Sequence, residues 1–306
     1  MGDSRTPPAR HYEKEPGELT QPSPPVGAVP PVALTIAGSD SSGGAGIQAD
    51  LKTFTVHGVY GASVITALTA QNTQGVRGVH AVPAEFVALQ LEAVLADLDV
   101  KALKTGMLAT AEIIETVSCT LSSGACHQLV VDPVMVATSG DPLLEPAAIS
   151  VMRNQLFPLA RLLTPNLEEA AVLCDRPVAA SRREMEDQGR QLLDLGPQAV
   201  LVKGGHCAWD EYEAADILVS ASGSEVFTAP RLDTPGTHGS GCSLSAAVVA
   251  HLAMGHGLSR AIRLAKAFVG VAIAGAQGRP VGRGRAPLDH LAGLNADFRA
   301  VEDDES

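Results

Sequence analysis

The sequence predicts an α/β fold: a mostly parallel central sheet with helices on both faces, a three-layer α/β/α arrangement. From Val32 onward, short apolar runs of strand length alternate with longer stretches of helical periodicity. This alternation is typical of parallel strands joined by crossover helices. Polar and Gly-rich loops follow several of the runs, and the 45% hydrophobic content is enough for a sizeable core.

Each element has its own local signal. A strand buried on both faces of a parallel sheet is apolar along its whole length. The predicted strands are Val32–Ala37, Ala62–Leu68, Lys101–Lys104, Leu129–Val131, Leu162–Leu163 and Val200–Val202. The helical segments have apolar residues three or four positions apart. The predicted helices are Ala45–His57, Pro83–Asp97, Ala111–Leu121, Ala147–Leu156, Asn166–Cys174, Arg182–Leu195, Gly241–Met254 and Leu258–Ala276.

Two parts of the chain differ in composition. Residues 1–31 are rich in Pro, Glu, Ser and Gly, and such a segment buries too little apolar surface to offset the entropy of ordering. We therefore predict a disordered Pro-rich tail over 1–31. Residues 32–306 contain no linker-like stretch within the body, which favours one domain.

Charge and cysteine content exclude several functional classes. The net charge of −12 argues against a surface that binds nucleic acid or an anionic membrane. No run approaches the roughly 20 apolar residues of a membrane span, and no secretory signal is visible at the N-terminus. The five cysteines form no C-x-x-C pair, so we expect reduced thiols and a cytoplasmic protein.

The run Thr237–Cys242 predicts an anion-binding turn. Its two glycines leave successive N–H groups uncovered where a helical pattern begins, and a helix N-terminus attracts negative charge. The same position lowers the pKa of a thiol, so we expect a thiolate there that could act as a base. The alternative makes the thiol a nucleophile with His238 as its base. The predicted anion site consists of Gly239, Ser240, Gly241 and Cys242.

A second Gly-rich loop follows the first strand. Gly44–Ala49 satisfies the dinucleotide pattern G-x-G-x-x-A, but the next strand ends at Gln71 with no acidic residue to hold a ribose. We therefore expect this loop to approach a small ligand with its backbone. The carboxamide of Gln71 suits the edge of a heterocycle, and Asp50 lies one turn into the helix. Either residue alone is also explained as solvated or capping.

Charged and amide side chains follow three other strands. Asn166 and Glu169 have the spacing of a helix capping box, which needs no catalytic explanation. A carboxylate at this edge of the sheet could equally hold hydrated Mg²⁺ beside nucleotide phosphates. Asp132 and Lys203 end strands on the same side. Acids, a lysine and an anion hole at one edge are the parts of a kinase that lacks a P-loop.

Together with further runs along the chain, these motifs resemble those of a known family, the hydroxymethylpyrimidine and phosphomethylpyrimidine kinases of thiamin biosynthesis. The likeness covers Val32 to about Leu291. The matching runs are Leu34–Asp40, Ser42–Thr53, Val64–Ala67, Ala70–Thr73, Lys104–Leu108, Asp132–Met135, Ser139–Asp141, Thr164–Ala170, Val202–His206 and His238–Ala247.

The resemblance implies a ribokinase-like fold and ATP-dependent phosphorylation of the pyrimidine, first at its hydroxymethyl group and then at the resulting phosphate. It also implies Mg²⁺ and a homodimer. By position, Gln71 is expected to grip the pyrimidine edge. The implied pocket lining is Gly38, Asp50, Met107 and Val134.

The remaining roles follow from the same resemblance. Gly239 to Cys242 are expected to form the anion hole and the base position. Asn166 and Lys203 are expected to bind ATP, and Glu169 and Asp132 to support the metal. Most ribokinase relatives have Asp where Cys242 stands, whereas pyrimidine kinases have Cys.

Other functions are compatible with parts of this pattern. Some pyridoxal kinases share the Cys-type scaffold, and their substrate is also a hydroxymethyl heterocycle. A non-catalytic pyrimidine-binding protein would keep the pocket without turnover, although an intact Glu169, Lys203 and anion hole speak against it. A thiol hydrolase is the most distant alternative.

Overall fold

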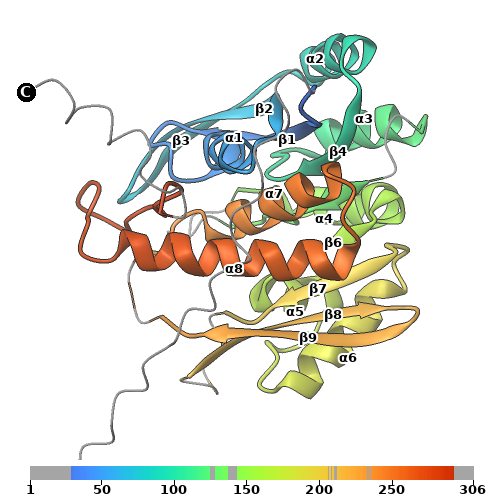
Figure 1. Ribbon diagram of the computed structural model, residues 1–306. Helices are drawn as coiled ribbons and strands as arrows, with labels where there is room; N and C mark the ends of the chain where they lie inside the picture. Colours follow the sequence, from blue (N-terminus) through green and yellow to red (C-terminus); the bar gives the residue numbers. More distant parts are fainter. Residues whose placement is uncertain are drawn as a thin grey trace, which may run out of the picture.

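The computed structural model describes residues 29–124, 128–136, 143–205, 207, 209, 212–232, 234 and 236–292. Residues 1–28 of the predicted disordered tail lie outside the described residues. The described chain forms one nine-stranded sheet with the strand order β3-β2-β1-β4-β5-β6-β7-β8-β9. Helices lie on both faces of this sheet, so the predicted three-layer α/β/α arrangement is confirmed (Figure 1).

The centre of the sheet is parallel, as predicted. Strands β2, β1, β4, β5, β6 and β7 are neighbours in that order and all pair in parallel. Each contains a predicted apolar run, and the long strands extend beyond it. Their bounds are β1 (Val32–Asp40), β2 (Tyr60–Asn72), β4 (Val100–Thr105), β5 (Leu129–Val131), β6 (Leu162–Leu163) and β7 (Ala199–Lys203).

Both edges of the sheet are antiparallel, and the sequence did not predict these strands. β3 (Gly75–Ala81) folds back on β2, and β8 (Glu213–Ser220) and β9 (Gly223–Pro230) form a hairpin that continues from β7. Most side chains of β3 and β9 are exposed or half-buried. They therefore lack the continuous apolar run by which the central strands are recognised.

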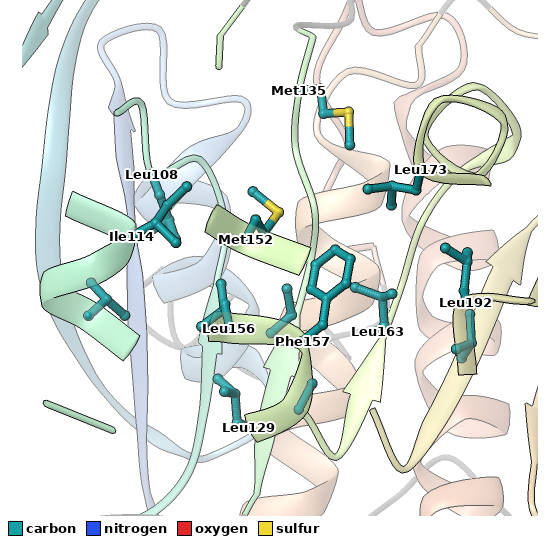
Figure 2. Close-up of a cluster of buried hydrophobic side chains, with 14 of the residues drawn as sticks. Leu108, Ile114, Leu129, Met135, Met152, Leu156, Phe157, Leu163, Leu173 and Leu192 are labelled. Atoms are coloured by element: carbon teal, nitrogen blue, oxygen red, sulfur yellow. The ribbon is translucent and has the colours of Figure 1, made fainter. Parts of the chain in front are cut away.

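One face of the sheet is covered by α1 (Gly46–Val56), α7 (Ser240–Ala253) and α8 (Leu258–Ala276), whose side chains form a cluster that includes Phe54, Val248 and Ile262 (Figure 1). The other face carries a larger cluster that includes Phe157 and Leu163 (Figure 2). Its helices are α2 (Ala84–Asp97), α3 (Ala111–Ser122), α4 (Pro146–Val151), α5 (Leu167–Cys174) and α6 (Arg182–Leu193).

The helix predicted over Ala147–Leu156 is not one regular α-helix. α4 ends at Val151, a π-turn covers Met152–Leu156, and a short 3₁₀ turn covers Phe157–Leu159. Pro158 lacks the N–H group that would continue the helical ladder, which accounts for the end of the helix there. In the described part of the chain, no helix is both long enough and apolar enough to cross a membrane.

The parallel strands bring the chemistry to one edge of the sheet. β1, β2, β4, β5 and β7 run in the same direction, so the residues after their carboxyl ends meet at that edge. Ligands of open α/β sheets bind in this position. The loops that follow these strands, together with the N-terminus of α7, make up the candidate site.

Candidate functional site

The anion-hole turn depends on a glycine in the left-handed region. Gly239 is the N-cap of α7 and has a φ of 82°. A Cβ atom built on Gly239 would lie 1.9 Å from the backbone oxygen of Gly44. Only glycine fits here, because any side chain would be strained and would also collide with the loop after β1.

The first turn of α7 has backbone donors to spare. The N–H of Ser240 donates to the Thr237 carbonyl at 3.1 Å. Among the described residues, the N–H groups of Gly241 and Cys242 have no backbone acceptor. The uncovered N–H groups that the sequence predicted are therefore present, and two free N–H groups at a helix N-terminus are suited to bind a phosphate or the charge of a transferring phosphoryl group.

The prediction of a thiolate at Cys242 is wrong for this structure. Burial raises the pKa of the Cys242 thiol to about 11, the Lys104 ammonium opposes this, and the carboxylates of Asp50 and Asp132 add to it. Loss of hydration therefore raises the thiol pKa by more than the helix N-terminus and the N–H donated by Gly46 lower it. The thiol is protonated at neutral pH.

This pKa has a direct test. We expect the rate at which iodoacetamide alkylates Cys242 to rise about tenfold for each unit between pH 7 and pH 10, because only the thiolate attacks. The rate is measured by mass spectrometry of the peptide that contains Cys242, with the exposed Cys119 as internal reference. A rate that levels off near pH 7 would show a thiolate and contradict the raised pKa.

A carboxylate that the sequence analysis did not single out organises the loop after β1. Asp40 is buried and accepts hydrogen bonds from the backbone N–H groups of Ser42, Gly44 and Ala45 at 2.8–3.1 Å. Although burial alone would raise the pKa of Asp40, hydrogen bonds from His238 and Ser42 hold it at about 2. An Asp two residues before a Ser and ahead of glycines is a signal for such a turn.

His238 belongs to this loop and is not paired with the thiol. Its Nε2 lies 3.0 Å from Oδ2 of Asp40. The thiol-hydrolase hypothesis needs His238 as the base of Cys242. The observed pairing engages the ring with Asp40 instead and gives that hypothesis no support.

Asp50 does not line the pocket as an accessible side chain. It is fully buried, with Oδ1 2.8 Å from Nζ of Lys104 and Oδ2 2.7 Å from Oγ1 of Thr35. Both carboxylate oxygens are therefore held inside the protein, so the solvated and capping interpretations are also wrong. Lys104, a lysine within a mostly buried strand, was the sequence signal for a buried partner.

The predicted apolar lining does come together. A Cβ atom on Gly38 would lie 3.0 Å from Sδ of Met107, so this glycine leaves room for the methionine. Met107 packs in a small cluster with Ala67 and Ala109, and Val134 is packed against it.

Gln71 lies at the end of β2 and lines a cavity of about 300 Å³ that His238 also lines. Its Oε1 accepts a hydrogen bond from Oγ1 of Thr69 at 3.1 Å. This contact orients the carboxamide at the wall of the cavity. Because His238 directly precedes Gly239, the cavity extends to the neighbour of the anion hole.

A buried ion pair joins the ends of β5 and β7. Nζ of Lys203 is 2.9 Å from Oδ1 of Asp132, which also accepts from Thr164 at 3.3 Å, while Oδ2 accepts from Ser245 at 3.2 Å. Burial alone would raise the pKa of Asp132, but the ammonium groups of Lys203 and Lys104 hold it below its usual value.

Asn166 and Glu169 form the capping box that their spacing predicts. The N–H of Asn166 donates to the carboxylate of Glu169, and the N–H of Glu169 donates to the Asn166 amide oxygen, both at 2.8 Å. The side chain of Glu169 is also buried. Burial raises its pKa to about 7, only partly opposed by Lys203, so this carboxylate lacks full charge compensation.

The donor set fits a hydrated Mg²⁺ better than a fully protein-bound one. In the described part of the chain, no three metal-ligating side chains converge. Mg²⁺ is commonly held by one or two carboxylates together with water and nucleotide phosphates. An undercompensated carboxylate at Glu169, with Asp132 nearby but engaged by Lys203, meets that requirement.

The ion pair and the anion hole are adjacent. A Cβ atom on Gly241 would lie 3.3 Å from Nζ of Lys203 and 4.0 Å from Oδ2 of Asp132. The lysine therefore places a positive charge beside the free N–H groups of the α7 turn. Such a pairing stabilises the negative charge of a phosphoryl group during transfer.

Comparison with known proteins agrees with this geometry. The family profile described as phosphomethylpyrimidine kinase matches residues 40–289. The hydroxymethylpyrimidine/phosphomethylpyrimidine kinase of Escherichia coli (strain K12) is 48% identical over 259 residues, covering 85% of this chain and 97% of the relative. The enzyme of the same name from Rhizobium meliloti (strain 1021) is 50% identical over 260 residues, with the same coverage of 85% and 97%.

A solved structure shows the same architecture. The ADP complex of Bacillus subtilis pyridoxal kinase has a TM-score of 0.78 and 38% identity, and covers 86% of this chain and 98% of that one. The ribokinase-like fold that the resemblance implied is thereby confirmed. With the family profile spanning most of the described residues and relatives near 50% identity, the chain belongs to the phosphomethylpyrimidine kinase family.

Proposed function

We propose that this kinase transfers the terminal phosphoryl group of ATP to the hydroxymethyl oxygen of 4-amino-5-hydroxymethyl-2-methylpyrimidine. It then phosphorylates the monophosphate to the diphosphate used in thiamin diphosphate biosynthesis. The observation that carries the proposal is the free N–H pair of the α7 turn, with Lys203 beside it. The names of the Escherichia coli and Rhizobium relatives support the same substrates.

On the acceptor side, the carboxamide of Gln71 binds the amino and ring-nitrogen edge of the pyrimidine. The apolar surface of Met107 and Val134, next to Gly38, packs against the ring. Cys242 orients the hydroxymethyl group as a neutral thiol. The Lys104 ammonium, which opposes the rise of the thiol pKa, lowers the free-energy cost of releasing the thiol proton to solvent, and the thiolate so formed is the species that can accept the alcohol proton during transfer.

On the nucleotide side, Lys203 and Asn166 bind ATP, and Glu169 with Asp132 supports Mg²⁺. The metal supplies charge neutralisation between the phosphates. The chain's own contribution is to hold the transferring group against Gly239, Ser240, Gly241 and Cys242, and to keep Lys203 in place through Asp132.

The test is ATP turnover with the hydroxymethylpyrimidine, its monophosphate and pyridoxal, each with Mg²⁺ and after chelation. We expect turnover of both pyrimidines, dependent on Mg²⁺. Pyridoxal is the second candidate acceptor because the Bacillus subtilis relative is a pyridoxal kinase. Turnover of pyridoxal alone would replace the proposal, and binding without ATP consumption would indicate a non-catalytic pyrimidine-binding protein.

Substitution of Gln71 distinguishes an effect on binding of the pyrimidine acceptor from an effect on binding of ATP. In Gln71→Leu the shape of the cavity persists but the ring edge loses its hydrogen bonds, and unpaired buried polar groups typically cost roughly 1–3 kcal/mol. We expect the KM of the pyrimidine to rise about tenfold or more on that basis, with the KM of ATP unchanged. Equal pyrimidine KM values for both proteins would exclude Gln71 from recognition.

We also propose that the enzyme is a cytoplasmic homodimer that associates through the β2–β3 edge. Leu68 and Val79, which lie on these two strands, are exposed at 47% and 44%. An edge strand with apolar side chains favours pairing with another chain, and a second copy would cover it. Sedimentation velocity of the wild type and of Val79→Lys measures this: a dimer is expected for the first and a monomer for the second.

A further inference from the structure

The segment Gly282–His290 contributes Gly284 and Arg285 to the wall of the cavity that Gln71 lines, and Thr73 anchors one end of the segment. The backbone N–H groups of Arg283 and Gly284 donate to Oγ1 of Thr73 at 3.2 and 3.1 Å, and the N–H of Arg285 donates to its carbonyl oxygen at 2.9 Å. A Cβ atom on Gly284 would lie 1.9 Å from that oxygen. The segment is therefore in close contact with the loop that follows Gln71.

The other end of this segment is anchored beside the anion hole. The N–H of His238 donates to the Ala286 carbonyl at 3.3 Å, and Oγ of Ser243 lies 2.9 Å from Nε2 of His290. Burial lowers the pKa of His290 to about 4, so its ring is neutral at physiological pH. With both ends attached to elements of the site, Arg285 is held at a defined position between them.

Arg285 lies in the wall of the cavity that Gln71 lines. The described residues that line it are Gln71, Asn72, Thr73, Gln74, Gly75, His238, Gly284 and Arg285. Arg285 supplies the permanent positive charge of this wall. Within the described ranges its guanidinium forms no ion pair, unlike that of Arg279, which lies 2.6 Å from Asp289. A guanidinium without an acidic partner at a cavity wall is suited to bind an anion in two-point contact.

Among the described residues that line this cavity, none is acidic, and the carboxylate of Asp40 lies behind His238. Asp40 contacts His238, and its carboxylate is turned toward the ring and the loop N–H groups, with which it forms hydrogen bonds. Its side chain is 3% exposed, so it does not enter the cavity. The charge that a ligand meets in this part of the cavity is therefore the positive charge of Arg285.

We propose that Arg285 binds the phosphate of the monophosphate acceptor and thereby favours the second phosphorylation over the first. The inference rests on the proposed function, because it names the acceptor state that this residue recognises. A hydroxymethyl group is neutral, whereas a phosphate monoester carries about −1.5 to −2 charges at pH 7. Arg285 thus attracts the second acceptor selectively.

The experiment compares Arg285→Gln with Arg283→Gln in the full chain. Both residues donate a backbone N–H to Thr73, but only Arg285 lines the cavity. We expect Arg285→Gln to raise the KM of the monophosphate about tenfold, the loss of one charge-assisted contact. The KM of the alcohol and of ATP should change less than about twofold, within the range of substitutions away from a contact. Arg283→Gln should leave all three values unchanged.

Salt supplies a second readout. In the wild type the KM of the monophosphate should rise between about 50 and 300 mM salt, because salt screens the attraction between an exposed guanidinium and a phosphate. This rise should be smaller in Arg285→Gln. Equal effects of Arg285→Gln on both acceptors would show that the residue only shapes the segment and would overturn the proposal. An unchanged monophosphate KM would do the same. Absence of pyrimidine turnover in the wild type would instead overturn the proposed function.

Discussion

Replacing Gly239 with Ala is expected to lower kcat by about 100-fold or more, the loss typical of a displaced oxyanion donor. Gly239 has a φ of 82°, and an added Cβ would lie 1.9 Å from the Gly44 oxygen. Either the loop after β1 or the first turn of α7 must then shift, and the N–H groups of Gly241 and Cys242 move with it. Steady-state kinetics with both pyrimidine acceptors measures the effect.

Gly58→Ala is the matched control for backbone strain. Gly58 has a φ of 70°, and a Cβ there would meet nothing within 4 Å. The left-handed conformation should cost this variant about 1–2 kcal/mol of unfolding free energy while kcat stays at the wild-type value. If Gly239→Ala lost no more kcat than Gly58→Ala does, the α7 turn would not be the site of phosphoryl transfer.

Replacing Lys203 with Met is expected to lower the free energy of unfolding by about 3–5 kcal/mol, the usual cost of removing one partner of a buried ion pair. Lys203 lies against Asp132, and its side chain is 13% exposed. Its loss leaves the Asp132 and Glu169 carboxylates buried without their shared cation. Urea unfolding measures the change, and turnover should fall sharply because the positive charge beside the anion hole is gone.

The pH dependence of the lost unfolding free energy shows whether the uncompensated carboxylates cause the loss. Without Lys203 the folded-state pKa values of both carboxylates rise, so the folded protein binds protons that the unfolded chain does not, and the deficit should shrink as the pH falls from 8 to 5. The pKa of Glu169 is already about 7 in the wild type, and loss of Lys203, which lowers it, should raise it further. A Glu169→Gln substitution added to Lys203→Met should restore part of the stability.

Lys101→Met is the control for loss of a lysine from a surface ion pair. Lys101 and its partner Asp99 are exposed at 51% and 80%, and substitutions of this kind usually change stability by less than about 0.5 kcal/mol. If Lys203→Met lost no more unfolding free energy than Lys101→Met, or if its loss did not vary with pH, other groups would be compensating the two carboxylates.

The central strands and the start of α5 were predicted correctly because each has a signal within its own few residues. Apolar runs marked β1, β4, β5 and β7, and Asn166 with Glu169 marked the N-terminus of α5 by the capping box that the structure contains. The edge strands β3, β8 and β9 were not predicted. The half-exposed strands β3 and β9 carry no such pattern, whereas β8 is mostly buried and its short apolar stretch was not recognised as a strand. The pairing of all three depends on the neighbours beside them.

For the site, the sequence by itself determined which groups reach the carboxyl edge: the glycines of the α7 turn, the acid and lysine that end β5 and β7, and the carboxamide that ends β2. Only the tertiary structure decided their chemical states. Asp50 and Lys104 are separated by 54 positions, yet the fold buries them together. Burial raises the thiol pKa of Cys242 to about 11, although its helix position alone favours a thiolate. Hydration and neighbouring charge are properties of the assembled surroundings, which local sequence does not contain.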